Sequence, residues 1–260
     1  MAARNNTRWT SAAARRLRGL AGNLQSVESA VCVVVDDLLR GISCPPTDLD
    51  AIFPRLNVTG HEPNDEVFGS GALLRDRHGF KIVYSSDLSH GRKRWTIAHE
   101  LGHALFERTG RNPPRSGREV ERLCDMIATE LLMPRACFGP RIRESVCLDG
   151  VLRLARLFQT SVTASAIRCA ELCGVSVFET EDGKFRWGFG AVRRGYTISS
   201  EEPLSQAVSS ALDADHGSKE IYLTLGGRSR VWLVEWSRIG QGNRTLFMLR
   251  PTNATTAREA

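Results

Sequence analysis

The segment RWTIAHELGHALFERTG, residues 94–110, constrains the fold of this chain more than any other part of the sequence. It contains two histidines four residues apart, and Glu100 directly follows His99. Positions i and i+4 of an α-helix lie on one face about one turn apart, so His99 and His103 can direct both imidazoles at one point. We therefore expect a helix of about twelve residues that ends at Gly110 and carries a polar site on one face.

Two imidazoles at this spacing are typical of a zinc site. Zn2+ binds imidazole nitrogen readily, and a catalytic zinc site has three protein ligands and a position open to water. Glu100 is rotated about 100° from His99 around the helix, so it can reach that water without occupying the ion. We predict His99 and His103 as metal ligands and Glu100 as the general base. The alternative is an amphipathic helix with histidines at the edge of the core. By chance, however, a chain of this composition would contain an HExxH motif only about 0.01 times.

The third ligand is expected on the next helix, REVERLCDMIATELLMP, residues 118–134. Glu121 and Asp125 are spaced four apart on it, beside an apolar stripe. The stripe consists of Val120, Cys124, Ile127, Ala128 and Leu131. In this arrangement the glutamate binds metal and the aspartate orients a ligating histidine. Glu107 lies about 12 Å along the helix axis from His99, too far to share one ion. A solvated surface position for Glu121 is the alternative.

KRWTIAHELGHALF followed by ERLCDMIATELLMP resembles the ImmA/IrrE family of zinc metallopeptidases. The resemblance covers residues 69–134, and LARLFQTSVTASAIRCAEL is similar to the helix-turn-helix-like segment that follows in that family. The sequence departs from the family pattern at Cys124, Asp125 and Ile127, where Ala, Asn and Phe are usual. The resemblance implies a zincin-like fold, Zn2+ as cofactor, and site-specific cleavage of a helix-turn-helix transcriptional repressor in a stress or mobile-element response.

The sequence pattern predicts an α+β protein of three parts. Residues 1–140 would form a zincin-like metallopeptidase domain with the HExxH helix and a small sheet, and residues 141–180 a helix-turn-helix-like helical segment. Residues 181–260 would form a C-terminal α/β domain that senses a signal or holds the substrate, and the resemblance implies that it is GAF-like. Trp232 and Trp236 should share one face of a strand in this domain. We expect both side chains to pack in its core rather than to bind a ligand.

Local patterns predict several further elements. GALLRD and GFKIVYSS, residues 71–76 and 79–86, predict a β-hairpin. Its strand Phe80–Tyr84 would offer an edge to an extended substrate, and Tyr84 or His90 would stabilise the oxyanion. Residues 11–39 have the spacing of one helical element that ends at Gly41, and residues 148–174 predict two helices with a tight turn at 159–161.

Composition limits the class of protein. Hydrophobic residues make up 42% of the 260, and no apolar run is long enough to span a bilayer. The seven cysteines are irregularly spaced and form no CxxC pair, which favours free thiols in a reducing cytoplasm. The opening segment, MAARNNTRWTSAAARRLRGLAG, lacks an apolar signal region. We interpret it as a basic lead into a helix rather than as a mitochondrial transit peptide.

The net charge of +6 would permit contact with nucleic acid. An inert metalloprotease fold that serves as a DNA- or protein-binding transcriptional regulator is therefore the alternative to a peptidase. The second helix of residues 148–174, VTASAIRCAEL, carries Arg168 as its single cation. A helix that reads base edges usually carries more Arg, Lys, Asn or Gln. We therefore expect this helix to pack rather than to bind DNA sequence-specifically, and we expect a protein substrate as the partner.

Overall fold

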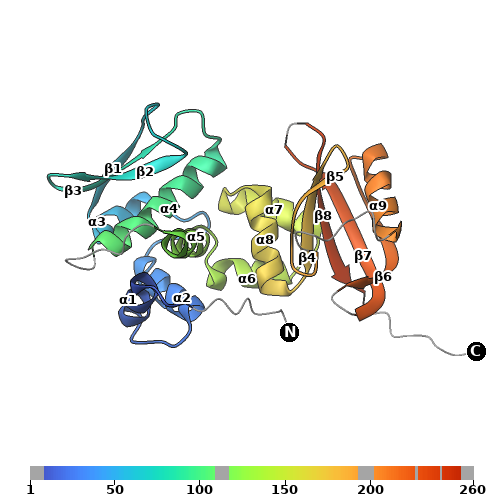
Figure 1. The fold of residues 1–260 in the computed structure, drawn as a ribbon, viewed down its shortest axis with the longest axis horizontal. Helices are drawn as coiled ribbons and strands as arrows, with labels where there is room; N and C mark the ends of the chain where they lie inside the picture. Colours follow the sequence, from blue (N-terminus) through green and yellow to red (C-terminus); the bar gives the residue numbers. More distant parts are fainter. Residues whose placement is uncertain (1–8, 109–116, 193–201, 226–227, 241, 253–260) are drawn as a thin grey trace, which may run out of the picture. The chain divides into compact units, whose positions relative to one another are not determined.

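The structure is a computed structural model that describes residues 9–108, 117–192, 202–225, 228–240 and 242–252 as helices, two sheets and their connections (Figure 1). The chain divides into two compact units. Of the described residues, the first unit contains 9–140 and 155–161, and the second contains 141–154 and 162–252. None of the helices in these described ranges is long and apolar enough to cross a membrane.

The first unit begins with two helices, α1 (Ala12–Leu20) and α2 (Val27–Leu38). Ser11 and Ser26 cap them, because each hydroxyl accepts a hydrogen bond from the backbone N–H three residues further on. The expectation of one helical element over residues 11–39 is wrong. Gly22 and Asn23, with φ of 75° and 64°, adopt left-handed conformations that end α1.

The sheet of the first unit has three strands. The segment η1 (Asp50–Ile52) and helix α3 (Phe53–Leu56) precede the strands β1 (Val58–Pro63), β2 (Gly71–Asp76) and β3 (Gly79–Tyr84). Strand β3 lies in the middle, parallel to β1 and antiparallel to β2, so the predicted hairpin is confirmed. The prediction that Phe80–Tyr84 offers an edge is wrong, because both sides of β3 are paired. The strand that is both at a sheet edge and in contact with the next helix is β2.

Two helices, α4 (His90–Arg108) and α5 (Arg118–Leu132), pack against each other at the centre of the first unit. Helix α4 has 19 residues and is longer than expected; Gly110, its predicted end, lies outside the described residues. The two helices approach closely at Gly102, where a Cβ would lie only 3.0 to 3.2 Å from the backbone and thiol of Cys124. The predicted apolar stripe of α5 is buried throughout.

Three helices follow: α6 (Arg135–Arg143), α7 (Leu148–Phe158) and α8 (Val162–Cys173). Helix α6 is not predicted from the sequence, and it contains a Gly139–Pro140 pair, a combination typical of a break. The predicted turn between α7 and α8 is confirmed, and Gln159 adopts a left-handed φ of 53° there. Helix α8 packs against the first strand of the second sheet.

The second unit contains an antiparallel sheet in the order β5-β4-β8-β7-β6 and a helix, α9 (Glu202–Asp213). Its strands are β4 (Ser176–Glu181), β5 (Lys184–Phe189), β6 (His216–Leu225), β7 (Arg228–Arg238) and β8 (Arg244–Pro251). Helix α9 contacts β6 and β7 (Figure 1). Trp232 and Trp236 are 3% and 7% exposed in the core beside Phe178 and Phe247, so the predicted core role is confirmed. The described strands of the second unit pair only antiparallel, so this unit is α+β rather than the α/β domain expected.

Candidate metal and catalytic site

The predicted site residues line one cavity of about 680 Å³ in the first unit. Helix α4 contributes His99, Glu100 and His103, which lie within about one turn of one another and line the cavity. Helix α5 contributes Glu121 and Asp125. Residues 70–73 and 75, on and just before β2, form the opposite wall. The structure therefore brings together the two histidines, the glutamate between them, and both acidic residues of the next helix.

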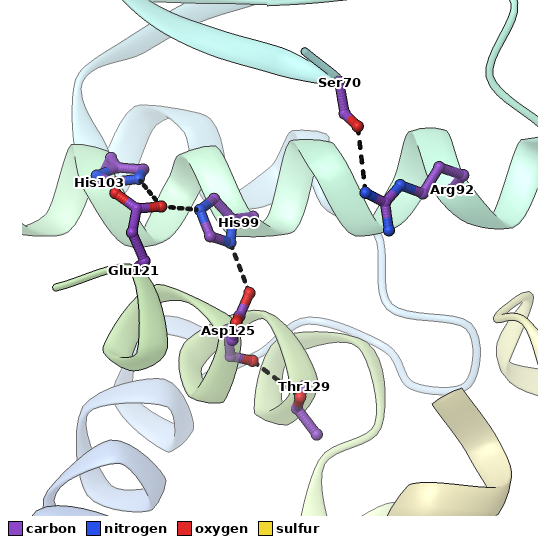
Figure 2. Close-up of polar contacts among 7 residues, drawn as sticks. All are labelled: Ser70, Arg92, His99, His103, Glu121, Asp125 and Thr129. Carbon is purple, nitrogen blue, oxygen red and sulfur yellow. Dashed lines mark hydrogen bonds and ion pairs between the residues drawn. The ribbon is translucent and has the colours of Figure 1, made fainter. Parts of the chain in front are cut away.

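Glu121 meets both histidines (Figure 2). Its Oε2 atom lies 3.2 Å from Nε2 of His99 and 3.6 Å from Nε2 of His103. Three atoms bound to one tetrahedral zinc ion at about 2.1 Å would lie roughly 3.4 Å from one another. Both distances from the carboxylate to the imidazoles are close to this value, so two imidazoles and a carboxylate form a set of donors that fits a zinc ion.

Asp125 supports His99 from the side away from Glu121. Nδ1 of His99 and Oδ1 of Asp125 are 3.0 Å apart (Figure 2), so the ring can donate from Nδ1 and keep Nε2 free for a metal. Burial opposes the charged form of the His99 ring, but the hydrogen bond and charge of Asp125 outweigh it and raise the pKa of His99. Burial lowers the pKa of His103.

Glu100 lines the cavity and is only 7% exposed. Burial raises the pKa of Glu100 to about 7; the charge of His99 opposes the rise and that of Glu121 adds to it. The backbone N–H of Leu73 donates a hydrogen bond to the Glu100 carboxylate and so fixes it against β2. A carboxylate with a pKa near neutrality is well matched to the transfer of protons at physiological pH.

The close approach of β2 to α4 depends on Gly71. A Cβ at this position would lie 2.3 Å from Cγ2 of Thr96 and 2.9 Å from the carbonyl oxygen of Val83. No real side chain tolerates such contacts, so only glycine lets the strand lie this close to the helix. The hydrogen bond from Leu73 to Glu100 needs this proximity.

Two residues suggested as oxyanion stabilisers do not line the cavity. Tyr84 is buried, and the Lys93 ammonium lies 4.5 Å from the centre of its ring. His90 is the first residue of α4 and is exposed. The structure brings neither to the site, and their proposed role stays a prediction.

Sequence patterns missed two polar pairs that border the cavity. Arg92 donates from Nη2 to the hydroxyl of Ser70 at 3.1 Å (Figure 2). Arg75 forms an ion pair with Glu107, also at 3.1 Å. The hairpin pattern located Arg75 and Ser70 on or beside a strand, but only the packing of that strand on α4 reveals their partners.

Cys124 also approaches the two histidines. His99, His103 and Cys124 each offer a ligand atom, and these three atoms lie within 4.8 Å of one another, so they too could hold a metal. The side chain is completely buried, and burial raises the pKa of its thiol. The sequence placed Cys124 in the apolar stripe of α5, which is correct, but gave it no part in a site.

Comparison with known proteins identifies the domain that contains this site. Residues 64–170 match the model of the IrrE N-terminal-like domain, which is a peptidase family. A search of curated proteins found no match. Among solved structures, a Mycobacterium tuberculosis transcriptional regulator is similar, with 13% identity and a TM-score of 0.46, over 92% of this chain and 74% of that chain. Residues 64–170, which include α4 and α5, are thus an IrrE N-terminal-like peptidase domain.

Proposed function

We propose that this protein is a zinc-dependent endopeptidase that cleaves a helix-turn-helix transcriptional repressor at a specific site, as part of a stress or mobile-element response. The observation that carries the proposal is the meeting of His99, His103 and Glu121 at ligand spacing, with Glu100 beside them in the same cavity. This set contains three ligands and a separate base, as hydrolysis by a zinc peptidase requires.

Each side chain would have a distinct task. His99, His103 and Glu121 would hold the ion, which supplies a Lewis acid for the scissile carbonyl and makes a nearby water more acidic. Glu100 would take the proton of the attacking water and pass it to the departing amine. The N–H of Leu73 would keep Glu100 in place, and Asp125 would keep His99 in the tautomer that leaves Nε2 without a proton.

Strand β2 is the element suited to bind the substrate. Since the N–H of Leu73 points at Glu100, it points away from β3, which β2 pairs with on its other side. Backbone groups alternate in direction along a strand, so Gly71 and Arg75 direct theirs toward the same unpaired edge. An extended peptide can add to such an edge through main-chain hydrogen bonds. This mode favours cleavage within an extended segment of a protein.

An inert DNA-binding regulator on the same fold is the alternative, and Arg168 argues against it. Its side chain is 6% exposed and forms an ion pair with Glu171 at 3.3 Å. The single cation of the candidate recognition helix is therefore engaged within the second unit rather than displayed to a base edge.

Arg168→Ala should leave any DNA binding unchanged and weak. A sequence-specific footprint by the isolated protein would favour the regulator.

The remaining assignments belong to the same proposal. The seven cysteines are free thiols, which suits the reducing cytoplasm where a repressor on DNA is found. Residues 1–140 would act as the zincin-like domain and residues 141–180 as a helical segment that packs. Residues 181–260 would sense a signal, in the manner of a GAF-like domain, or hold the substrate.

Incubation with candidate repressors tests the activity. The protein, loaded with zinc, should cut the helix-turn-helix repressor encoded beside it at one position, as mass spectrometry of the fragments would show. Chelated protein and Glu100→Gln protein should both leave the repressor whole. Equal cleavage by the chelated sample would show that the cleavage does not depend on zinc and would reject the proposal.

Zinc affinity tests the ligand set. Glu121→Ala should lower zinc affinity sharply because it removes a ligand. Asp125→Ala should lower zinc affinity by about 10–100-fold, because it removes only the hydrogen bond that orients His99. Glu119 provides the control on the same helix: its carboxylate accepts a hydrogen bond from the backbone N–H of Ser11 at 3.0 Å, outside the cavity. If Glu121→Ala binds zinc as tightly as Glu119→Ala, Glu121 is not a ligand.

A further inference from the structure

One end of the cavity carries a cation that no carboxylate of the described residues neutralises. Arg92 lies in the first turn of α4, and its exposed side chain lines the cavity. Its guanidinium donates from Nη2 to the hydroxyl of Ser70, and it forms no ion pair within the part of the chain that the structure describes. Arg75, the other arginine of the cavity wall, is already paired with Glu107 at 3.1 Å. Arg92 therefore has guanidinium N–H groups to offer to a bound molecule.

The negative charge of the cavity lies away from Arg92. On α4, the acidic residues of the wall come after His99, and those on α5 contact the histidines. The residues of α4 that line the cavity before His99 are Arg92, Trp95 and Thr96, none of which is acidic. Apart from the proposed metal, the Arg92 end is thus the part of the cavity that attracts an anionic group of a substrate.

Arg92 is aligned with the proposed metal along α4. Seven residues separate it from His99, which is nearly two full turns, so both lie on one face of the helix, about 10.5 Å apart along its axis. Figure 2 shows the Arg92 side chain reaching from α4 toward Ser70, which directly precedes β2. An extended chain advances about 3.4 Å per residue, so this distance corresponds to about three substrate residues.

We propose that Arg92 selects substrates that carry a carboxylate two to four residues from the scissile bond. This inference rests on the proposed endopeptidase and on an extended substrate beside β2. A guanidinium binds a carboxylate through two parallel charge-assisted hydrogen bonds, and Ser70 holds this guanidinium toward β2. An Asp or Glu side chain and the C-terminus of the substrate both supply such a carboxylate, and the experiment distinguishes the two.

Cleavage of the repressor encoded beside the protein tests the selection. The full-length, zinc-loaded protein should cut it two to four residues from an Asp or Glu, as mass spectrometry of the fragments would show. Replacing that acid by its amide should lower kcat/KM by about 10–100-fold, as the loss of a hydrogen bond to a charged group does. Arg92→Gln should do the same, and the two changes together should cost little more than either one, because both remove the same contact.

Reversal of the charges separates recognition from a structural role. Arg92→Glu should cut the unchanged repressor slowly, and it should recover much of the rate on a repressor with Lys in place of the acid. A residue that only stabilises the fold would not show this recovery. If the cut instead lies two to four residues from the C-terminus of the repressor, and extension of that end slows cleavage as Arg92→Gln does, the terminal carboxylate is the group that Arg92 binds.

Lys93→Gln is the matched control. It removes one positive charge from the same turn of α4, but its ammonium lies 4.5 Å from the centre of the Tyr84 ring rather than in the cavity wall. It should retain the rate and the preference for the carboxylate. A cut with no carboxylate within four residues, or losses that simply add in the combined variants, would overturn the role of Arg92 and leave the peptidase standing. Failure of the wild-type protein to cut the repressor would overturn both.

Discussion

Glu100 is the side chain on which the proposed hydrolysis depends most. Glu100→Gln retains the shape of the side chain, and its amide oxygen can still accept the hydrogen bond from Leu73, so the fold and the metal should be preserved. The amide cannot take a proton, and the rate should fall by about 10²–10⁴-fold. Initial cleavage rates together with metal analysis of the purified variant measure both effects.

Glu107 offers the control for this substitution. It borders the same cavity, but its carboxylate is paired with Arg75 at 3.1 Å. Glu107→Gln should therefore retain most of the rate. If Glu100→Gln loses its metal along with its activity, Glu100 is a ligand rather than the base.

Arg244 is a single residue with a predictable effect on stability. Glu179 is 1% exposed, and its two carboxylate oxygens accept hydrogen bonds from Nε and Nη2 of Arg244, both at 2.9 Å. Arg244→Ala leaves a buried charge without this partner and should lower the free energy of unfolding by about 3–5 kcal/mol. Chemical denaturation of the wild-type and variant proteins measures this loss in the free energy of unfolding. Arg250→Ala breaks one 3.3 Å contact with Glu235 and should lower the free energy of unfolding clearly less. Equal losses for the two variants would contradict this expectation.

At the scale of elements, the position of β2 against α4 depends on Gly71. Gly71→Ala must push the strand away from Thr96 and Val83, which should cost about 1–3 kcal/mol of stability. It should also lower the cleavage rate, because the hydrogen bond from Leu73 to Glu100 is stretched. Thermal denaturation and initial rates measure the two losses.

Gly19, in helix α1, is the matching control. A Cβ there meets nothing nearer than 3.9 Å, so Gly19→Ala should stabilise the protein by about 0.5–1 kcal/mol. Full activity of Gly71→Ala would show that β2 does not position the base.

The elements also show what local sequence patterns can and cannot predict. Helical spacing located α4 and α5 and put His99 and His103 on one face of α4, but the contact of Glu121 with both histidines depends on how the two helices pack. The edge of the small sheet was assigned to β3 instead of β2, because strand order depends on contacts between distant segments, here with β1. Cys124 looked like an ordinary core residue for the same reason: its nearness to the histidines depends on Gly102 of the other helix.

At the scale of the whole molecule, two compact units predict two unfolding transitions. A metal that binds only folded protein stabilises the unit that holds it, by about 2.7 kcal/mol at a free concentration of 100 times Kd. Zinc should therefore raise the melting temperature of one calorimetric transition and leave the other in place. His99→Ala should abolish the shift without removing the second transition. One single transition that moves as a whole would mean that the two units unfold together.

All the groups assigned to catalysis and metal binding lie between residues 70 and 125, and the antiparallel sheet of the second unit begins only at Ser176. During synthesis on the ribosome, the chain that carries α4, α5 and the β2 hairpin leaves the exit tunnel well before that sheet is complete. Domains generally fold as units, those nearer the N-terminus first. The proposed zinc site can therefore assemble on a nascent chain before the second unit exists, so any restraint that this unit imposes on the proposed cleavage would begin only after translation is nearly finished.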